Sequence, residues 1–361
     1  MRVASKQIHE QLVTIFRAWG MSDSHARTTA DIMVETDLRG VDSHGVSMLP
    51  TYDAEFRAGR LNMTPTFKTV RENLATALLD ADASLGHPVS VHAMHLAVDK
   101  CLQAGVGVVA VRNSHHFGAA GCYARIAADR GVIGLVTSAT RGVTMVPTFG
   151  AEPVLGTNPL AFAAPAKRNA PFQLDMATTT VAAGKVKVYK LNHKPLPPGW
   201  VVDADGKTVT DEREAFGTVF EKKDGGITPL GGTRDAGSHK GYGLAVMVHI
   251  LAGTLAGASF SPIRNKTQKP SDPHDIGHFF LAIDPRAFRD DDAFEEDLDQ
   301  VIDILHGTRR ADPKQPVLVA GDPEMLTKSE RLEQGVPVPD DLMEQLRAVA
   351  ERANVKFVLQ P

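Results

Sequence analysis

The chain has 361 residues, which is long enough for two or three domains with a large hydrophobic core. Its 39 basic and 43 acidic residues leave a net charge of −4, so no nucleic-acid partner is expected. No run of about 18 apolar residues and no apolar signal core occur, so we expect no membrane partner and a cytoplasmic location. The only cysteines, Cys101 and Cys122, exclude a disulfide framework and are expected to be buried in helices.

The first part of the chain shows both helical and strand patterns. Two amphipathic helices are expected within 6–38, broken at 20–23, and Ser22 or Asp23 would cap the second. Further helices are expected at 48–58, 88–104 and 119–130. Strands are expected at 66–80, 106–112 and 132–137. Strands that alternate with helices in this way predict an α/β or α+β fold.

The second part of the chain begins with a region of different amino-acid composition. From 139 to 235, short apolar pieces such as 159–164 and 172–176 are separated by Pro, Gly and Asn. An apolar helix is then predicted at 241–255 and a strand at 278–284. Acidic helices at 292–307 and 339–352 follow. No internal repeat is present.

The most informative segment is Asn-Ser-His-His-Phe-Gly at 113–118, where the chain leaves the predicted strand 106–112. Loops at strand ends are where polar chemistry is usually placed. His115 and His116 are suited to proton transfer near neutral pH, and the following glycine lets a ligand approach the backbone. A strand end with two solvated histidines is the simpler alternative.

Three further segments could bind or react. In Asp-Ser-His-Gly at 42–45, Ser43 could orient the imidazole of His44, although a helix C-cap with a left-handed Gly45 explains the same letters. Ser-His-Lys-Gly at 238–241 opens the predicted helix, where a lysine would strengthen an anion site. Gly-Thr-Asn-Pro at 156–159 could offer donors to a ligand or be a plain turn.

Other patterns are misleading. Residues 105–110 match G-x-G-x-x-A by letter, but these glycines begin a strand instead of following one. Residues 203–206 resemble the start of a calcium loop with the glycine in the wrong place. The histidine pairs 92/95 and 274/278 lack the third ligand that a catalytic zinc needs, so we expect no metal.

Taken together, these segments resemble the type 2 malate/L-lactate dehydrogenases. That family also includes ureidoglycolate and sulfolactate dehydrogenases and piperideine-2-carboxylate reductases. The resemblance extends from about residue 6 to about residue 350. The segments that carry it are 42–46, 113–118, 156–159, 175–178, 198–200, 203–206 and 239–244.

The resemblance implies an α/β (α+β) fold that is not Rossmann, with a nicotinamide-binding domain inserted into a discontinuous second domain. We therefore expect an N-terminal helical region at 1–65 and an NAD(P)-binding domain at 123–274. Residues 66–122 together with 275–361 would form a discontinuous domain for substrate binding and dimerisation. The implied protein is a homodimer that uses NAD or NADP.

The resemblance also implies roles for particular residues. Tyr52 and Thr157 would face the substrate, and His239 and Lys240 would contact the cofactor phosphates. The remaining expected cofactor contacts are His116, Phe117, Gly118, Ala119, Ala120, Thr140, Asp175, Met176 and Ala177.

Two departures from the family pattern concern the substrate. Where most members carry an arginine that binds the substrate carboxylate, this chain has Met48, and we expect Arg141 to replace it. Cyclic-imine reductases have an aspartate after the glycine that corresponds to Gly184, but here Lys185 follows. An imine-reducing relay of serine, histidine and aspartate is therefore incomplete.

The activity expected is hydride transfer between a nicotinamide and C2 of a small 2-hydroxy or 2-oxo carboxylic acid. A histidine would exchange the proton, and we favour His116 by a small margin over His44 with its neighbour Ser43. Two alternatives stay open: an NADPH-dependent reductase of cyclic imino acids, and a non-catalytic nucleotide-binding protein. Which acid is used, and whether NAD or NADP, is left undecided by the sequence.

Overall fold

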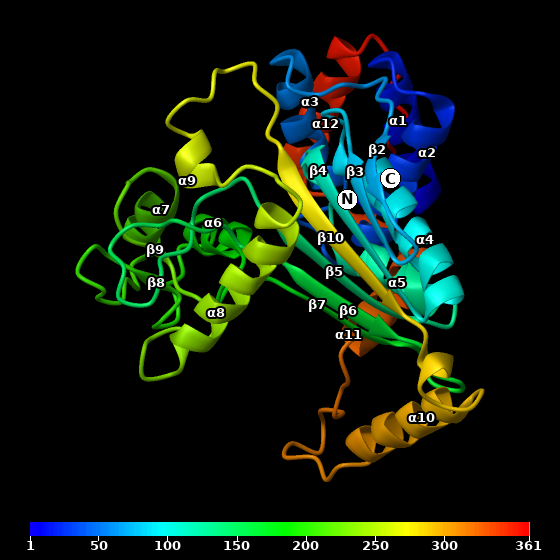
Figure 1. Ribbon diagram of the computed structural model, residues 1–361. Coiled ribbons are helices and arrows are strands. Elements are labelled where there is room, and N and C mark those ends of the chain that lie inside the picture. The colour runs from blue at the N-terminus through cyan, green and yellow to red at the C-terminus, as the bar shows by residue number, and fades with distance from the viewer. Residues whose placement is uncertain (361) are drawn as a thin grey trace.

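A seven-stranded mixed sheet forms the centre of the protein, whose computed structural model describes residues 1–360 (Figure 1). Its strand order is β2-β3-β4-β10-β5-β6-β7, in which only the β3–β4 pair is parallel. The strands are β2 (Lys68–Glu72), β3 (Thr76–Asp80), β4 (Val106–Ser114), β5 (Ile133–Ala139), β6 (Leu160–Ala164), β7 (Phe172–Met176) and β10 (Ile276–Ile283). The predicted α/β class is confirmed. The strands expected at 106–112, 132–137 and 278–284 form β4, β5 and β10, and the segment 66–80 contains the two strands β2 and β3.

Strand β10 joins the two halves of the sheet because it pairs with β4 on one side and β5 on the other. Ile276 is opposite Ser114, and Gly277 is opposite Ala139. The segments that follow β4 and β5 and the segment that precedes β10 therefore meet at one end of the sheet.

Helices cover the sheet and form two further groups. The α-helices are α1 (Ser5–Ala18), α2 (Asp23–Leu38), α3 (Leu49–Arg57), α4 (Gly86–Ala104), α5 (Gly121–Ala128), α6 (Ala183–Leu191), α7 (Glu212–Phe220), α8 (Ser238–His249), α9 (Ser261–Arg264), α10 (Ala293–His306), α11 (Asp322–Gln334) and α12 (Asp340–Arg352). Shorter elements are the pairs β1 (Arg2–Val3) with β11 (Val336–Pro337) and β8 (Val201–Val202) with β9 (Gly226–Ile227), the 3₁₀ turns Val46–Met48 and Pro285–Ala287, and a π-helical turn Ile250–Thr254.

Local expectations for the helices hold with one shift. The hydroxyl of Ser22 accepts a hydrogen bond from the His25 N–H and so caps α2 as predicted. Cys101 and Cys122 are buried in α4 and α5. Helix α8 begins at Ser238, three residues before the predicted start, so the histidine and lysine that follow lie in its first turn.

The hydrophobic core is divided among three main regions. One lies between the sheet and helices α4 and α5, around Val109, Val111 and Phe280. A second packs α1, α2 and α3 against α12, so that the two ends of the chain share one core. A smaller one fills the lobe of α6 and α7, which lies on the left in Figure 1. Within residues 1–360, no helix combines the length and apolar character needed to cross a membrane.

Candidate active site

A left-handed Asn113 lies next to the last residue of β4 and directs the segment that follows the strand. Its φ is 52°, a conformation that asparagine tolerates better than most residues. The Asn113 N–H donates to Asp275 Oδ1 at 2.9 Å, and its side-chain amide donates to Asp80 Oδ1 at 2.9 Å. These bonds fix the direction in which the chain leaves the sheet through Ser114 to His115 and His116.

The structure brings together four residues expected to belong to the site. The Tyr52 hydroxyl lies 2.6 Å from His116 Nδ1, and the His44 ring lies 5.3 Å from the His116 ring between centroids. Ser43 Oγ lies 2.7 Å from His44 Nδ1. Neither imidazole Nε2 has a hydrogen-bond partner among the residues described, so both remain available to a ligand.

Burial keeps both imidazoles neutral at pH 7. It lowers the pKa of His116 well below its usual value, and the nearby His44 and His87 lower it further. Burial also lowers the pKa of His44. Tyr52 is fully buried, which raises the pKa of its phenol, so the hydroxyl keeps its proton. The pair is thus suited to accept a proton from a substrate hydroxyl.

A buried carboxylate shapes the turn that carries His44. Asp37 Oδ2 accepts the Val46 N–H at 2.8 Å, and burial raises the pKa of this carboxyl to about 7. A Cβ at Gly45 would lie 1.8 Å from Asp37 Oδ1. Gly45 has φ −92°, so the alternative of a left-handed C-cap at this position is wrong. The glycine is needed because the carboxylate lies where a side chain would be.

Several residues expected to contact the cofactor are small or buried, and they follow His116 along the chain. Phe117 stacks on His278 with ring centroids 4.4 Å apart, Ala119 and Ala120 are buried, and Gly118 (φ 77°) packs on His87. Asp175 Oδ2 accepts the Gly121 N–H at 2.7 Å, at the start of α5.

The remaining expected cofactor and substrate positions lie at the ends of β5, β6 and β7. Burial raises the pKa of Asp175 to about 6, and Met176 ends β7 immediately before Ala177. The Thr140 hydroxyl donates to Asn158 Oδ1 at 3.2 Å, and the Thr157 carbonyl accepts the Thr178 N–H at 2.9 Å.

The first turn of α8 differs from the residues that follow His116 because it is exposed. His239 and Lys240 are both exposed there, and they follow Ser238 and Gly237, whose φ is 98°. A Cβ at Gly237 would lie 3.6 Å from the Lys240 side chain. Free N–H groups and a lysine at a helix N-terminus are suited to a phosphate.

Met48, where most family members carry an arginine, and Arg141, its expected replacement, lie in different surroundings. Met48 packs against the core of α1, α2 and α3 and brings no charge. Arg141 is half-buried after β5, where its guanidinium donates to Gln268 Oε1. Burial lowers its pKa, as do the charges of Arg264 and Arg60. Arg141 therefore lies in a group of arginines at the end of the sheet.

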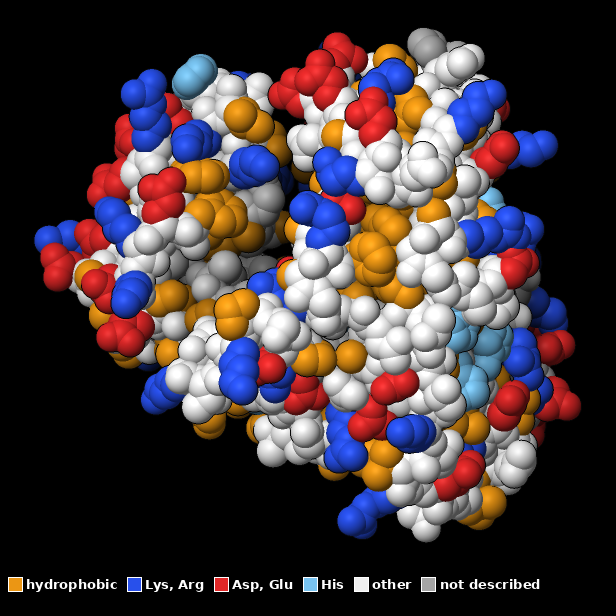
Figure 2. All heavy atoms as spheres, turned by 90° about the horizontal axis from the view of Figure 1, so that it is seen from above, with side chains coloured by type: hydrophobic (Ala, Val, Ile, Leu, Met, Phe, Trp, Pro, Cys, Tyr) orange, Lys and Arg blue, Asp and Glu red, His pale blue; other side chains and the backbone are white. Residues whose placement is uncertain are grey.

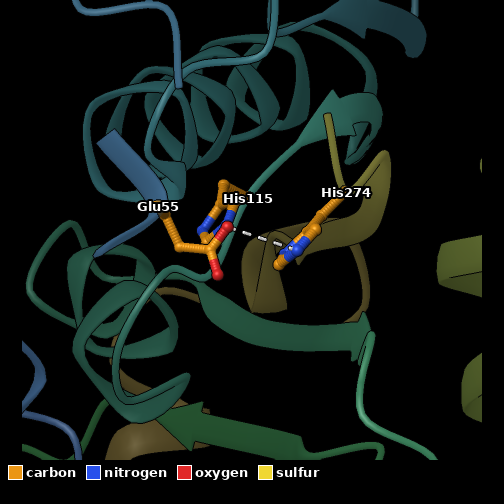
Figure 3. Close-up of side chains that lie close together, drawn as sticks. All are labelled: Glu55, His115 and His274. Atoms are coloured by element: carbon orange, nitrogen blue, oxygen red, sulfur yellow. Dashed lines mark ion pairs between the residues drawn. The ribbon is translucent and has the colours of Figure 1, made fainter. Parts of the chain in front are cut away.

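The sequence did not predict a cluster of Glu55, His115 and His274 (Figure 3). Glu55 Oε2 lies 3.7 Å from His115 Nε2 and 3.4 Å from His274 Nε2, and the two rings stack with centroids 4.4 Å apart. His278, the sequence partner of His274 in the rejected metal pair, instead bonds Ser138 at 2.9 Å. Spacing could not reveal this cluster, because its members come from α3, the exit of β4 and the residues before β10.

A polar pocket of about 330 Å³ opens beside this cluster; it is lined by Arg112, Asn113, Gly257, Arg264, Pro273 and Asp275. Figure 2 shows a separate hollow between the lobe on the left and the body on the right, with Lys and Arg side chains along its border. The surface around this hollow is therefore suited to negatively charged ligands.

Comparisons with known proteins give a consistent result. The malate dehydrogenase of Pyrococcus horikoshii is 37% identical over 358 residues, covering 99% of this chain and 96% of the relative. The L-sulfolactate dehydrogenase of Methanocaldococcus jannaschii is 34% identical, covering 96% of this chain and 95% of the relative. The crystal structure of malate dehydrogenase from Entamoeba histolytica matches with a TM-score of 0.93 at 31% identity, covering 99% of both chains. The family model for malate/L-lactate dehydrogenase matches residues 3–347, and the chain belongs to that family.

Proposed function

We propose that this chain is an NAD(P)-dependent dehydrogenase of small 2-hydroxy carboxylic acids, malate-like or lactate-like. Family membership supports the reaction class. The observation that carries the proposal is the neutral His116, bonded at Nδ1 by Tyr52 and free at Nε2, with His44 beside it. A base with that protonation state and a free nitrogen can take the proton of a substrate hydroxyl.

Tyr52 allows His116 to work in both directions of the reaction. A hydroxyl can donate or accept, so it bonds Nδ1 in either tautomer of the imidazole. In the tautomer with Nδ1–H, which donates to Tyr52 and gives up the long 3.4 Å bond from the Gly118 N–H, Nε2 accepts the hydroxyl proton during oxidation. In reduction, Nε2–H returns a proton to the carbonyl oxygen. Acid–base help of this kind contributes on the order of 10²–10⁴ in rate.

The residues fit a dinucleotide cofactor, NAD or NADP. The buried nitrogens of His87 have no partner in the described part of the chain, and the ring lies against Gly118, which the small residues Ala119 and Ala120 follow. His116, Phe117, Thr140 and residues 175–177 would complete this side of the site. His239 and Lys240 would bind phosphate at the start of α8. When bound, the nicotinamide supplies or accepts the hydride.

The proposal includes the organisation implied by the family resemblance. Residues 1–65 form the N-terminal helical region, 66–122 with 275–361 the substrate and dimerisation domain, and 123–274 the NAD(P)-binding domain. The sheet runs across these limits, because β5 pairs with β10. The proposed protein is a cytoplasmic homodimer that binds a small carboxylate.

Reduction of cyclic imino acids is a weaker candidate on structural grounds. Gly184 lies beside Ser43, since a Cβ there would be 3.9 Å from Ser43 Cβ. The following residue is Lys185, whose ammonium lies 5.4 Å from the centre of the Trp200 ring. The position where an imine reductase would carry an aspartate thus brings no carboxylate to Ser43.

A substrate panel tests the proposal. Purified protein is incubated with NADH or NADPH and a set of 2-oxo acids and cyclic imino acids, and nicotinamide absorbance is followed. We expect turnover of at least one 2-oxo acid, and loss of that turnover in His116→Ala even at saturating cofactor concentration. Turnover of imino acids alone would support the reductase. Cofactor binding without any turnover would support a non-catalytic nucleotide-binding protein.

A further inference from the structure

Three arginines from separate segments meet around Glu55. Arg60, just after α3, donates to both Glu55 oxygens at 3.0 and 2.9 Å. Arg264, in α9, lies 3.7 Å from Asp275, and its guanidinium also donates to the Pro273 carbonyl. Arg141 reaches the same group from the end of β5, where the loop residue Gln268 accepts its hydrogen bond.

The group has more donors than acceptors. Three guanidiniums are offset by two carboxylates, those of Glu55 and Asp275. Both ring nitrogens of His115, which is only 4% exposed, have no partner among the described residues, and neither do the Nε atoms of Arg141 and Arg264. Buried donors without acceptors are costly, so this arrangement favours a ligand that carries negative charge.

A metal ion fits the same residues less well, although Glu55, His115 and His274 are close enough to share one. The two rings stack at 16°, so their in-plane lone pairs run side by side instead of converging on one point. Both Glu55 oxygens already accept from Arg60. Against the effect of burial, the bonds from Arg60 and the nearby His115 and His274 rings hold the pKa of Glu55 at about 2. Positive charge is therefore already in excess before any cation binds.

Helix α3 places this group next to the proton-transfer site. Tyr52, which bonds His116, and Glu55, which faces His115, are three positions apart on α3. Residues at that spacing lie on one face of a helix, with Cβ atoms about 5–6 Å apart. The two histidines are also consecutive in the chain. The arginine group and the proton-transfer site are therefore neighbours along α3.

We propose that Arg60, Arg141 and Arg264, together with His115, form a subsite for a second negatively charged group of the substrate. This inference rests on the proposed function and narrows its substrate class to 2-hydroxy acids with two acidic groups, whether carboxylate or sulfonate. It also refines the role of Arg141. Arg141 belongs to a shared anion site around Glu55, which lies one turn of α3 from Tyr52, and is not a lone substitute for the arginine absent at Met48.

Selectivity between acids tests the subsite. For a four-carbon 2-oxo dicarboxylate, Arg141→Gln is expected to lower kcat/KM by about 10- to 100-fold, mainly through KM, since a charge-assisted bond is lost. For 2-oxobutanoate, which lacks the second carboxylate, Arg141→Gln should lower kcat/KM by less than about threefold. Arg264→Lys keeps the charge and should retain most of the selectivity even if Arg264→Gln fails to fold. Arg286→Gln, at the opposite end of β10, is the matched control. It should leave kcat/KM unchanged for both the dicarboxylate and 2-oxobutanoate.

Ligand binding measured in the absence of turnover tests the anion subsite separately from the proposed dehydrogenase function. Malonate at millimolar concentration should raise the melting temperature of the wild-type protein more than acetate does, and Arg141→Gln should remove the difference. If malonate stabilises but no acid is turned over, the subsite stands and the proposed function fails. Equal losses for the dicarboxylate and for 2-oxobutanoate would overturn the subsite. Stoichiometric Zn²⁺ binding that disappears in His274→Ala would also overturn it.

Discussion

The exit of β4 and the start of α8 are both expected to contact the cofactor, yet they are built in opposite ways. At the exit of β4, His116 is enclosed and held by Tyr52, and the turn carrying His44 is fixed by the buried Asp37. At the start of α8, His239 and Lys240 are exposed. Proton transfer needs groups held in place before substrate arrives, whereas phosphate binding can order a flexible lysine at the moment of contact.

Removing His116 is the strongest test of the enclosed region. We expect His116→Ala to lower kcat/KM for hydroxy-acid oxidation by about 10²–10⁴, because the general base is lost. His44→Ala should cost less, since its ring lies beside His116 and is not bonded to it. Steady-state kinetics of both variants decide the point. A larger loss in His44→Ala would assign the proton to His44.

The turn of His44 should tolerate no side chain at Gly45. In Gly45→Ala the new Cβ would meet the Asp37 carboxylate at 1.8 Å, and overpacking of this kind costs about 1–3 kcal/mol. Thermal unfolding should show a clear fall in melting temperature. Gly243→Ala, where a Cβ would meet nothing within 4 Å, is the matched control and should be neutral or stabilising. Equal melting temperatures for the two variants would contradict this account of the turn.

The pH dependence should reflect the lowered pKa of His116. Only the neutral imidazole can accept a proton, and burial with the neighbouring histidines keeps it neutral below pH 6.5. For oxidation, kcat/KM is therefore expected to stay level as pH falls from 8 through 6.5, and to drop about tenfold per unit only at lower pH. An acidic limb centred above pH 7 would show that another group controls the step.

Tyr52 should affect catalysis more than substrate binding. Tyr52→Phe removes the bond to His116 Nδ1, and an unpaired buried group costs about 1–3 kcal/mol, or about 10-fold and more in kcat. The KM for the acid should change little, because Tyr52 is fully buried and acts through His116. This separates it from the substrate contact expected from the family resemblance. A rise in KM at constant kcat would restore that role.

Substitution at the exposed start of α8 should give the smallest change in kinetics or binding. Lys240→Ala is expected to weaken cofactor binding about two- to fivefold without changing kcat, since a charge at an exposed helix end contributes about 0.3–1 kcal/mol. The difference should shrink at high salt because the lysine is exposed. Titration of NADH and NADPH at two ionic strengths measures both points. A fall in kcat would mean that α8 takes part in the chemical step.

Much of this molecule could be predicted from short-range patterns. The strands were predictable from their apolar runs, and His116 and His44 were recognised because each lies in a compact polar motif. Glu55 carried no such signal, since one glutamate on an amphipathic helix is ordinary. Its importance comes from His274 and Arg141, which only the pairing of β10 with its neighbours brings close. Likewise, the need for glycine at 45 depends on Asp37, whose burial the sequence does not show.

The central place of β10 has a consequence for how the protein is made. The bond between Asn113 and Asp275 joins residues 162 positions apart, and β10 fills the space between β4 and β5. A growing chain therefore presents both strands with unpaired edges for a long interval, which is when aggregation is most favourable. Because such distant contacts form slowly, the site becomes complete late in folding. A nascent chain that ends between His116 and Asp275 contains both histidines of the motif but not the contact that directs them.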